Sequence, residues 1–207
     1  MKRTFFILLS MILISNFSIS QTNWGAELNL IEFDSLIHNR IYEIGVEDYQ
    51  IVQLIELKNG EFGGTLTHSV WTTNRKEERI KRIVQKINIS ERIAKILMIN
   101  LIKNNFENIP KCDENDGCLI GLDGTTTFFN VKTNKIEKSQ SYWELESDYY
   151  YKEPNIPNSV RQSRKILDLI NEQFDLKEQF GNFTSRLPFG KYIYSSMIME
   201  RKRKNVW

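Results

Sequence analysis

YQIVQLIELKNGEFGGTLTHSVW, residues 49–71, decides the fold that the sequence predicts. Its first part, residues 51–57, is rich in Ile, Val and Leu, which favours a β-strand. Asn59-Gly60 follows, and both residues tolerate the positive φ of a tight hairpin turn. Residues 61–71 return as the partner strand, with Gly63-Gly64 as a candidate β-bulge. The stretch therefore predicts an antiparallel β-hairpin.

The segments that follow predict further strands and a first long helix. Residues 79–89 are rich in β-branched side chains and favour a strand. Ser90 is a suitable N-cap for an amphipathic helix that runs to about Asn105, with apolar residues at positions 93, 96, 97 and 101. Residues 118–144 predict strand, turn and strand, with one turn at Asp123-Gly124 and another at 133–135.

The last third of the chain predicts a second long helix and a closing strand. The helix covers residues 158–175 and is capped by Asn158 or Ser159; a short helix at 176–183 and a strand within 187–200 follow. Residues 27–38 fit either a short helix or an extended segment, and both alternatives stay open. The expected fold class is α+β, a mixed and mostly antiparallel sheet with two principal helices packed on it. Because the chain lacks repeats and Pro/Gly-rich linkers, we expect a single domain over residues 21–200.

The first residues have the pattern of a secretory signal peptide. Lys2 and Arg3 precede a mostly apolar run that ends at Phe17, and Ser18-Ile19-Ser20 supplies small residues before a cleavage site between Ser20 and Gln21. The run is short for a membrane span, which needs about 20 residues. We therefore expect a signal peptide at 1–20, no membrane span after its cleavage, and a location in a bacterial periplasm or outside the cell. An uncleaved N-terminal anchor is the alternative.

The charge of the mature chain argues against general nucleic-acid binding. The full chain has 28 basic and 26 acidic residues, and removing residues 1–20 takes away two cations and no anion. A neutral chain lacks the basic field of a nucleic-acid-binding protein. The charge is uneven, however, because residues 75–82 and the tail at 201–207 are basic, whereas 113–123 and 144–153 are acidic. The tail is a solvated end or a contact for a membrane surface or an acidic partner.

Both cysteines lie in KCDENDGCLIGLDG, residues 111–124. In an exported chain, two cysteines predict one disulfide, here Cys112–Cys118, which would stabilise by roughly 2 kcal/mol in the chain-entropy model. A redox pair normally has a two-residue spacing, and no recognised zinc spacing connects these cysteines with His38 and His68. The same stretch carries the hard oxygen ligands Asp113, Asn115 and Asp116, but the EF-hand register fails. We expect no metal and no cofactor; a cation loop of another kind stays an alternative to a solvated turn.

A second stretch, SYWELESDYYYKEP at 141–154, combines aromatic and acidic side chains. Rings with carboxylates suit sugars, cationic ligands or a protein interface. The alternative is that the rings cover a sheet edge. Together the two stretches supply the candidate residues for binding a ligand or partner: Asp113, Asp116, Asp123, Tyr142, Trp143, Glu144, Tyr149, Tyr150 and Tyr151. We expect the two stretches to lie near each other, because strands joined by short turns usually pair.

The sequence offers little support for catalysis. His68 and Ser69 are neighbours that point to opposite faces of a strand, and the chain has no G-x-S-x-G, P-loop or G-x-G-x-x-G motif. A carboxylate pair for glycoside hydrolysis would come from Asp116, Asp123, Glu144 and Glu146. The leading hypothesis is an exported, non-catalytic binding protein for an unknown protein or glycan, for example of the inhibitor or immunity type. The rivals are a small carbohydrate-active hydrolase and a structural component of the cell envelope.

Overall fold

The computed structural model describes residues 24–113, 115, 117–121 and 123–202. The predicted signal peptide and the end of the basic tail lie outside these residues. The helices are α2 (Trp24–Glu27), α3 (Glu91–Lys103), the short 3-10 helix η1 (Phe106–Asn108), α4 (Asn158–Phe174) and α5 (Leu176–Ser185). The strands are β1 (His38–Val46), β2 (Gln50–Leu57), β3 (Phe62–Thr73), β4 (Arg79–Ile89), β5 (Thr126–Thr133), β6 (Glu137–Trp143), β7 (Gly190–Tyr194) and β8 (Met197–Arg201).

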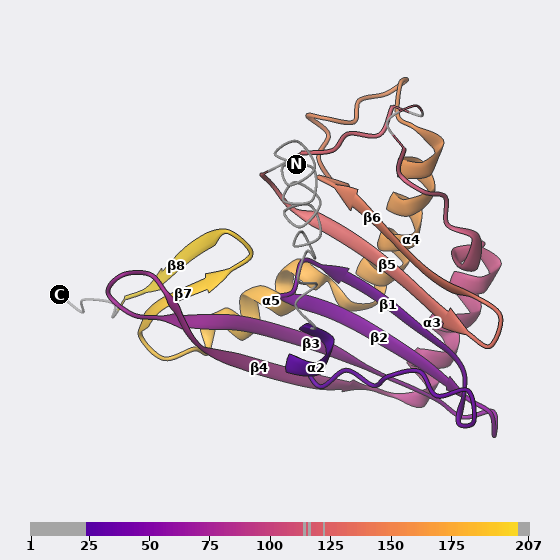
Figure 1. Ribbon diagram of the computed structural model, residues 1–207, viewed down its shortest axis with the longest axis horizontal. Coiled ribbons are helices and arrows are strands. Elements are labelled where there is room, and N and C mark those ends of the chain that lie inside the picture. The colour runs from indigo at the N-terminus through magenta and orange to yellow at the C-terminus, as the bar shows by residue number, and fades with distance from the viewer. Residues whose placement is uncertain (1–23, 114, 116, 122, 203–207) are drawn as a thin grey trace, which may run out of the picture.

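The strands form one curled sheet, in the order β6-β5-β1-β2-β3-β7-β8, with β4 paired to β3 (Figure 1). Every pairing between the described strands is antiparallel. The long strand β3 makes this arrangement possible. Its first half pairs with β2, whereas Trp71 and Thr72 near its end pair with β7. The β7–β8 hairpin therefore extends the sheet as an arm, which is at the left of Figure 1.

Three helices pack against one face of this sheet. The inward residues of α3 are Ala94, Leu97, Met98 and Leu101, a spacing that gives one apolar stripe on a helix. The stripe packs in one core cluster with the even-numbered side chains of β1 and β2 and with residues of α4. Phe129 lies in the middle of this core and meets Phe106 and Tyr142 in edge-to-face contacts with centroids 6.0 and 5.7 Å apart. Burial of apolar surface between helices and sheet is thus the main stabilising term.

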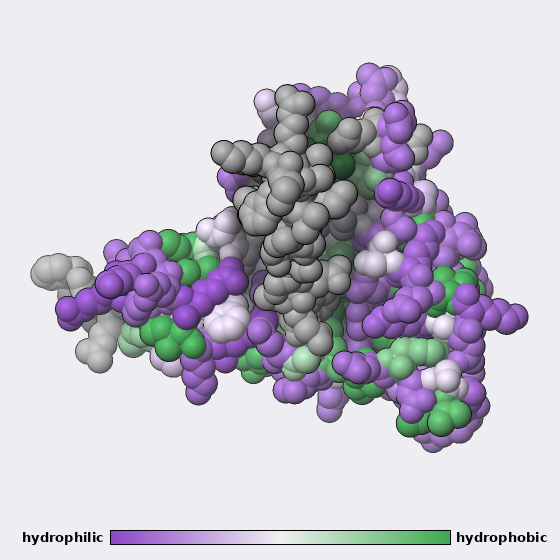
Figure 2. All heavy atoms as spheres, in the orientation of Figure 1, coloured by the Kyte–Doolittle hydropathy of each residue, from purple (hydrophilic) through white to green (hydrophobic). Residues whose placement is uncertain are grey.

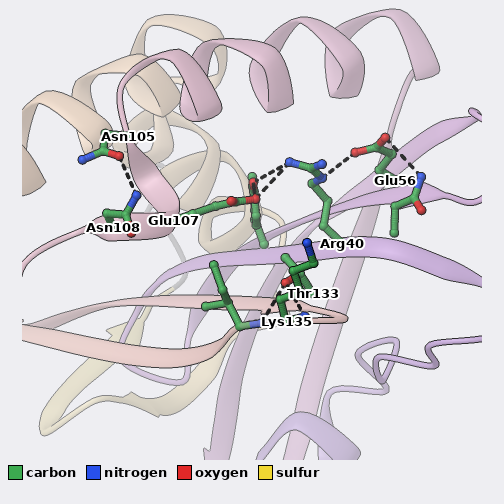
Figure 3. Close-up of polar contacts among 10 residues, drawn as sticks. Arg40, Glu56, Asn105, Glu107, Asn108, Thr133 and Lys135 are labelled. Carbon is green, nitrogen blue, oxygen red and sulfur yellow. Dashed lines mark hydrogen bonds and ion pairs between the residues drawn. The ribbon is translucent and has the colours of Figure 1, made fainter.

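A polar network closes one end of the helix-covered face (Figure 3). Arg40 on β1 reaches Glu107 of η1 at 2.9 Å and Glu56 of β2 at 2.6 Å. The Tyr42 hydroxyl donates to the same Glu107 carboxylate at 2.6 Å. Burial is the main cause that raises the pKa of Tyr42, and the Glu107 carboxylate adds to it. The network ties the loop after α3 to the two central strands.

The α+β class and most of the predicted elements are confirmed, with corrections in detail. The sheet is antiparallel rather than mixed, and α5 is a third substantial helix beside α3 and α4. The hairpin at Asn59-Gly60 forms, but the β2–β3 register continues without a bulge at Gly63-Gly64. Gly64 serves close strand approach instead, because a Cβ there would lie 2.4 Å from the Gln53 carbonyl oxygen. None of the described helices has both the length and the apolar character that crossing a membrane requires.

Two other local predictions were wrong. No strand forms at 118–121, where the disulfide fixes Cys118 and the side chains of Leu119 and Ile120 are exposed. The chain end is a hairpin, β7–β8, rather than a single strand, since Ser195 adopts a positive φ of 51° and reverses the chain. The N-cap of α4 is Pro157, just before the two residues expected there. Strand β1, which the sequence did not indicate, is a central strand between β2 and β5.

Candidate functional site

A row of polar side chains crosses the sheet on the face opposite the three main helices. Its members lie directly opposite one another on neighbouring strands from β4 to β6, in the order Asn88, Thr65, Gln53, Glu43, Asn130 and Ser139. Glu43 accepts hydrogen bonds from Gln53 Nε2 at 2.9 Å and from Asn130 Nδ2 at 3.0 Å. The Ser139 hydroxyl donates to Asn130 Oδ1 at 2.7 Å. Two amides therefore fix the orientation of a carboxylate that is only 7% exposed.

The N-terminal segment, residues 24–37 before β1, covers part of this polar face. Leu28 is fully buried in a small cluster with Ile51 and Phe128. The backbone of Ile31 exchanges two hydrogen bonds with the Gln53 side chain, at 3.1 and 2.9 Å. Gln53 therefore links the segment to Glu43 and to the rest of the polar row.

Arg82 of β4 anchors the same segment from the other side. Its guanidinium pairs with Glu27 of α2 at 2.7 Å and with Asp48 of the β1–β2 turn at 2.5 Å. It also donates to the Ser69 hydroxyl at 3.2 Å and lies over the Trp71 ring, 5.1 Å from its centroid. The arginine side chain is largely buried, so these partners replace the water that it loses. Three elements are thereby held together at one edge of the polar face.

A cleft of about 1560 Å³ opens on this face. It lies between the N-terminal segment, the β1–β2 turn, strands β5 and β6, and the loop before β5. Hydrogen-bonding side chains predominate along the cleft, and acidic side chains outnumber basic ones. These polar lining residues are Glu32, Glu43, Glu47, Asp48, Arg79, Asp123, Thr126, Asn130, Lys132, Glu137, Lys138 and Ser139. Phe33, Phe128 and Trp143 supply aromatic rings. Hydrophilic side chains also predominate in the view of Figure 2, with hydrophobic ones in smaller groups.

Trp143 lines the cleft at the end of β6 and joins the two stretches that the sequence singled out. Its Nε1 donates to the Asp123 carbonyl oxygen at 2.6 Å, and its ring lies 4.6 Å from the Tyr150 ring, centroid to centroid. The indole packs so closely on Gly121 that a Cβ there would lie 2.2 Å from a ring carbon. The loop at 117–124 and the stretch at 141–154 therefore lie side by side, as expected, and Trp143 is the point of contact.

The acidic candidates have different surroundings. Asp123 lines the cleft, and its carboxylate accepts the Gly124 N–H at 3.0 Å. Glu144 uses Oε1 to accept the Thr125 N–H at 2.6 Å, which holds the start of β5. Asp113 is outside the cleft; the N–H of Asn115 bonds its side chain and lowers its carboxyl pKa. Asp116 lies outside the described residues. Glu146, a further carboxylate considered for hydrolysis, does not line the cleft.

The tyrosine candidates divide between core and surface. Tyr142 and Tyr151 are buried in the main core, where they support the sheet–helix packing. Burial raises the pKa of both phenols. Tyr149 is 74% exposed, and Tyr150 connects it to Trp143 through ring contacts. Of the candidate aromatic residues, Trp143 alone lines the cleft, and Tyr150 contacts its ring.

The Cys112–Cys118 disulfide is present, with the two Cα atoms 5.5 Å apart. Cys118 is buried in the main core, and its sulfur lies 3.5 Å from the Ser159 hydroxyl at the start of α4. The disulfide therefore anchors the loop whose continuation reaches Trp143. Within the part of the chain that the structure describes, no three His, Cys, Asp or Glu side chains come together as metal ligands.

Sequence reasoning missed the polar row, of which Glu43, Asn130 and Ser139 line the cleft. Glu43 and Gln53 are acidic and amide residues within otherwise apolar strands, at IYEIGV and IVQLIE. A polar residue in such a position signals either a solvated face or a buried partner. That pattern could have drawn attention to them, but their partners become visible only once the register of β1, β2 and β5 is known.

Comparison with protein-family models, with curated protein sequences and with solved structures gives no match for this chain.

Proposed function

We propose that the protein is an exported, non-catalytic binding protein, and that the cleft on the polar face receives an oligosaccharide. The observation that carries the proposal is the oriented polar row beside Trp143. Amide, hydroxyl and carboxylate groups at fixed positions suit the many hydroxyl groups of a sugar, and an indole suits the apolar face of its ring. At about 1560 Å³ the cleft exceeds the usual small-molecule pocket of about 300–1,000 Å³, which favours a chain of several sugar units.

Export is the second part of the proposal. It is supported by the signal-like pattern of residues 1–20 and by the Cys112–Cys118 disulfide, since disulfides persist in oxidising compartments. Mass spectrometry of the chain from its native host tests this part. The expected first residue is Gln21, and a chain that begins at Met1 in the exported fraction would contradict cleavage.

A binding role fits the carboxylates better than hydrolysis does. A glycosidase needs two carboxyl groups that flank one bond, one of them free to donate a proton. Of the described carboxylates that the sequence offered for this role, only Asp123 lines the cleft, and Glu144 holds the backbone of Thr125. Glu43, which the cleft adds, accepts two amide hydrogen bonds. Glu43 and Glu144 are thus each held by hydrogen-bond donors, which suits fixed acceptors for a ligand.

The test is a binding assay with a matched aromatic control. Purified mature protein is titrated by calorimetry with chitooligosaccharides, cellooligosaccharides and soluble peptidoglycan fragments. At least one class should bind, and Trp143→Ala should weaken it at least about tenfold, the effect of losing a well-packed aromatic contact. Tyr149→Ala removes an exposed ring outside the cleft and should leave the affinity unchanged.

Two results would refute the oligosaccharide proposal: no binding to any of the three glycan classes, or equal loss of affinity in the Trp143 and Tyr149 variants. Release of reducing sugar from the same glycans would instead establish a hydrolase. Circular dichroism of both variants confirms that the fold is retained.

A further inference from the structure

Strand β4 is an edge of the sheet and runs along the lower border in Figure 1. Among the described strands it pairs only with β3, from Ile89 opposite Gly64 to Arg79 opposite Thr73. The strand is 11 residues long, and its outer edge has no strand partner within the described chain. Such an edge presents a row of backbone N–H and C=O groups that an extended chain can pair with.

The side chains of β4 are unusually basic. The strand, RIKRIVQKINI, contains Arg79, Lys81, Arg82 and Lys86 and no acidic residue. The flanks add little to this charge, because Glu77 and Glu78 balance Arg75 and Lys76 on one side and Glu91 precedes Arg92 on the other. Because the chain without residues 1–20 has balanced charge, this is a local concentration of positive charge along one edge.

Most of this charge is available to a partner. Arg82 is used internally, by Glu27 and Asp48. Lys81 is exposed and belongs to none of the ion pairs between described residues, and Arg79 donates to the neutral carbonyl of Ser195. Lys86 likewise bonds a carbonyl, that of Asn29. These three cations therefore have no anion of their own.

Exposed apolar side chains lie among the cations along the same edge. Ile80 is 61% exposed, and Val84 and Ile87 are each 38% exposed. Val84 and Ile87 are three residues apart, so they lie on opposite faces of the strand, while Ile80 lies at the register shift between Arg79 and Lys81. An added strand would therefore cover exposed apolar surface on both faces of β4.

The charges also decide which strand can be added. An antiparallel pair of β4 strands centred on Val84 would place Arg82 across from Lys86, and such a pairing of like charges destabilises a sheet. An acidic strand would instead meet Arg79, Lys81 and Lys86 and gain long-range attraction as it approaches.

We propose that the outer edge of β4 binds an extended, acidic segment of another protein as an additional β-strand. Backbone hydrogen bonds supply the general affinity, Lys81, Arg79 and Lys86 select acidic side chains, and Ile80, Val84 and Ile87 receive the apolar residues between them. Lys81 and Lys86 lie outside the oligosaccharide cleft, whereas Arg79 lines it as well, and neither proposal depends on the other.

The experiment uses the mature chain and a fluorescently labelled peptide of alternating Glu and Val, as long as β4. Fluorescence anisotropy should show saturable binding, and a peptide of alternating Lys and Val should not bind. Lys81→Glu should weaken the Glu–Val peptide about fivefold or more, whereas Lys135→Glu, the same charge reversal in the exposed β5–β6 turn, should change it less than about twofold.

An N-methylated copy of the Glu–Val peptide separates strand addition from simple charge attraction. N-methyl groups at every second residue remove backbone donors and keep all charges, so affinity should fall at least about tenfold. Equal binding of the methylated peptide, equal effects of Lys81→Glu and Lys135→Glu, or no binding of the Glu–Val peptide would each overturn the proposal.

Discussion

The two faces of the sheet differ in how far they are covered and in the interactions that fix their side chains. On the helix-covered face, Tyr42, Phe129 and Tyr142 are buried among apolar side chains and aromatic rings. On the opposite face, Glu43, Gln53 and Asn130 are held by hydrogen bonds to one another and to the N-terminal segment. Neighbouring residues of the same strand thus belong to different environments.

We expect stability and recognition to come from different faces of the sheet. Apolar burial is non-directional and proportional to area, so it fixes the helices on the sheet without creating a specific surface. Hydrogen-bonded side chains are directional and present spare donors and acceptors at set positions. We therefore expect the helix-covered face to dominate the free energy of unfolding and the polar face to dominate binding.

Adjacent phenylalanines on β5 give the largest test of the comparison. Phe129 is fully buried under the helices, so Phe129→Ala should lower the free energy of unfolding by about 4 kcal/mol. Phe128 points to the other face and packs in the small cluster with Leu28 and Ile51, so Phe128→Ala should cost about 2 kcal/mol. Urea denaturation measures both. Equal losses would show that the faces do not differ in this way.

His68 stacks on Phe183 of α5 and gives a pH test of burial on the helix-covered face. Burial lowers its pKa to about 4, below the value of 6.5 expected in an unfolded chain. Below pH 6.5 the unfolded state takes up a proton that the folded state refuses, so stability falls as the pH falls toward 4. The loss between pH 7 and pH 4 should be about 3 kcal/mol, of which about 2 kcal/mol occurs by pH 5.

The comparison protein for this pH test is His68→Leu, which cannot titrate at that position. Gln50 Nε2 loses its 3.3 Å contact with His68 Nδ1 in the variant but keeps its hydrogen bond to the Leu176 carbonyl oxygen at 2.7 Å. The unfolding free energies of the two proteins should converge or cross as the pH falls. Parallel curves between pH 7 and pH 5 would contradict the buried, neutral histidine.

Asn130 gives the smallest expected effect and tests the polar face directly. Asn130→Ala removes a donor to the Glu43 carboxylate and the acceptor of the Ser139 hydroxyl, so we expect a loss of about 2 kcal/mol. Ser141→Ala is the control, because Ser141 lies on the same face of β6 outside the polar row and is exposed. Its cost should be below about 0.5 kcal/mol. Similar costs for both variants would mean that the row contributes nothing beyond a solvated surface.

The sequence predicts the local elements better than their arrangement. The Asn59-Gly60 hairpin and the apolar stripes of α3 and α4 carry short-range signals, and the structure contains all three. Strand β1 escaped detection because Asn39, Arg40 and Glu43 interrupt its apolar pattern, and these residues are satisfied by partners from β2, β5 and η1. Those contacts are made across long sequence separations, which local patterns do not contain.

The candidate site shows the same limit. The disulfide and the contact between the two unusual stretches follow from composition and spacing, and the structure confirms both. The fate of individual side chains does not follow, because Tyr142 and Trp143 are sequence neighbours and only one of them faces the cleft. One shift of the alternation exchanges core and surface, so the orientation had to come from the pairing of β5 with β6.

Because Phe128 and Phe129 are adjacent on β5, Asn130 helps to fix the register of β5 against β1. If β5 slid by one position along β1, Phe128 and Phe129 would exchange faces, so each face would still receive one phenylalanine ring. Asn130, however, would move beneath the helices and leave its amide without Glu43 or Ser139, while Glu43 would lose a donor. The amide therefore adds a polar cost to a slipped register, beyond the apolar cost of moving Val131 out of the main core.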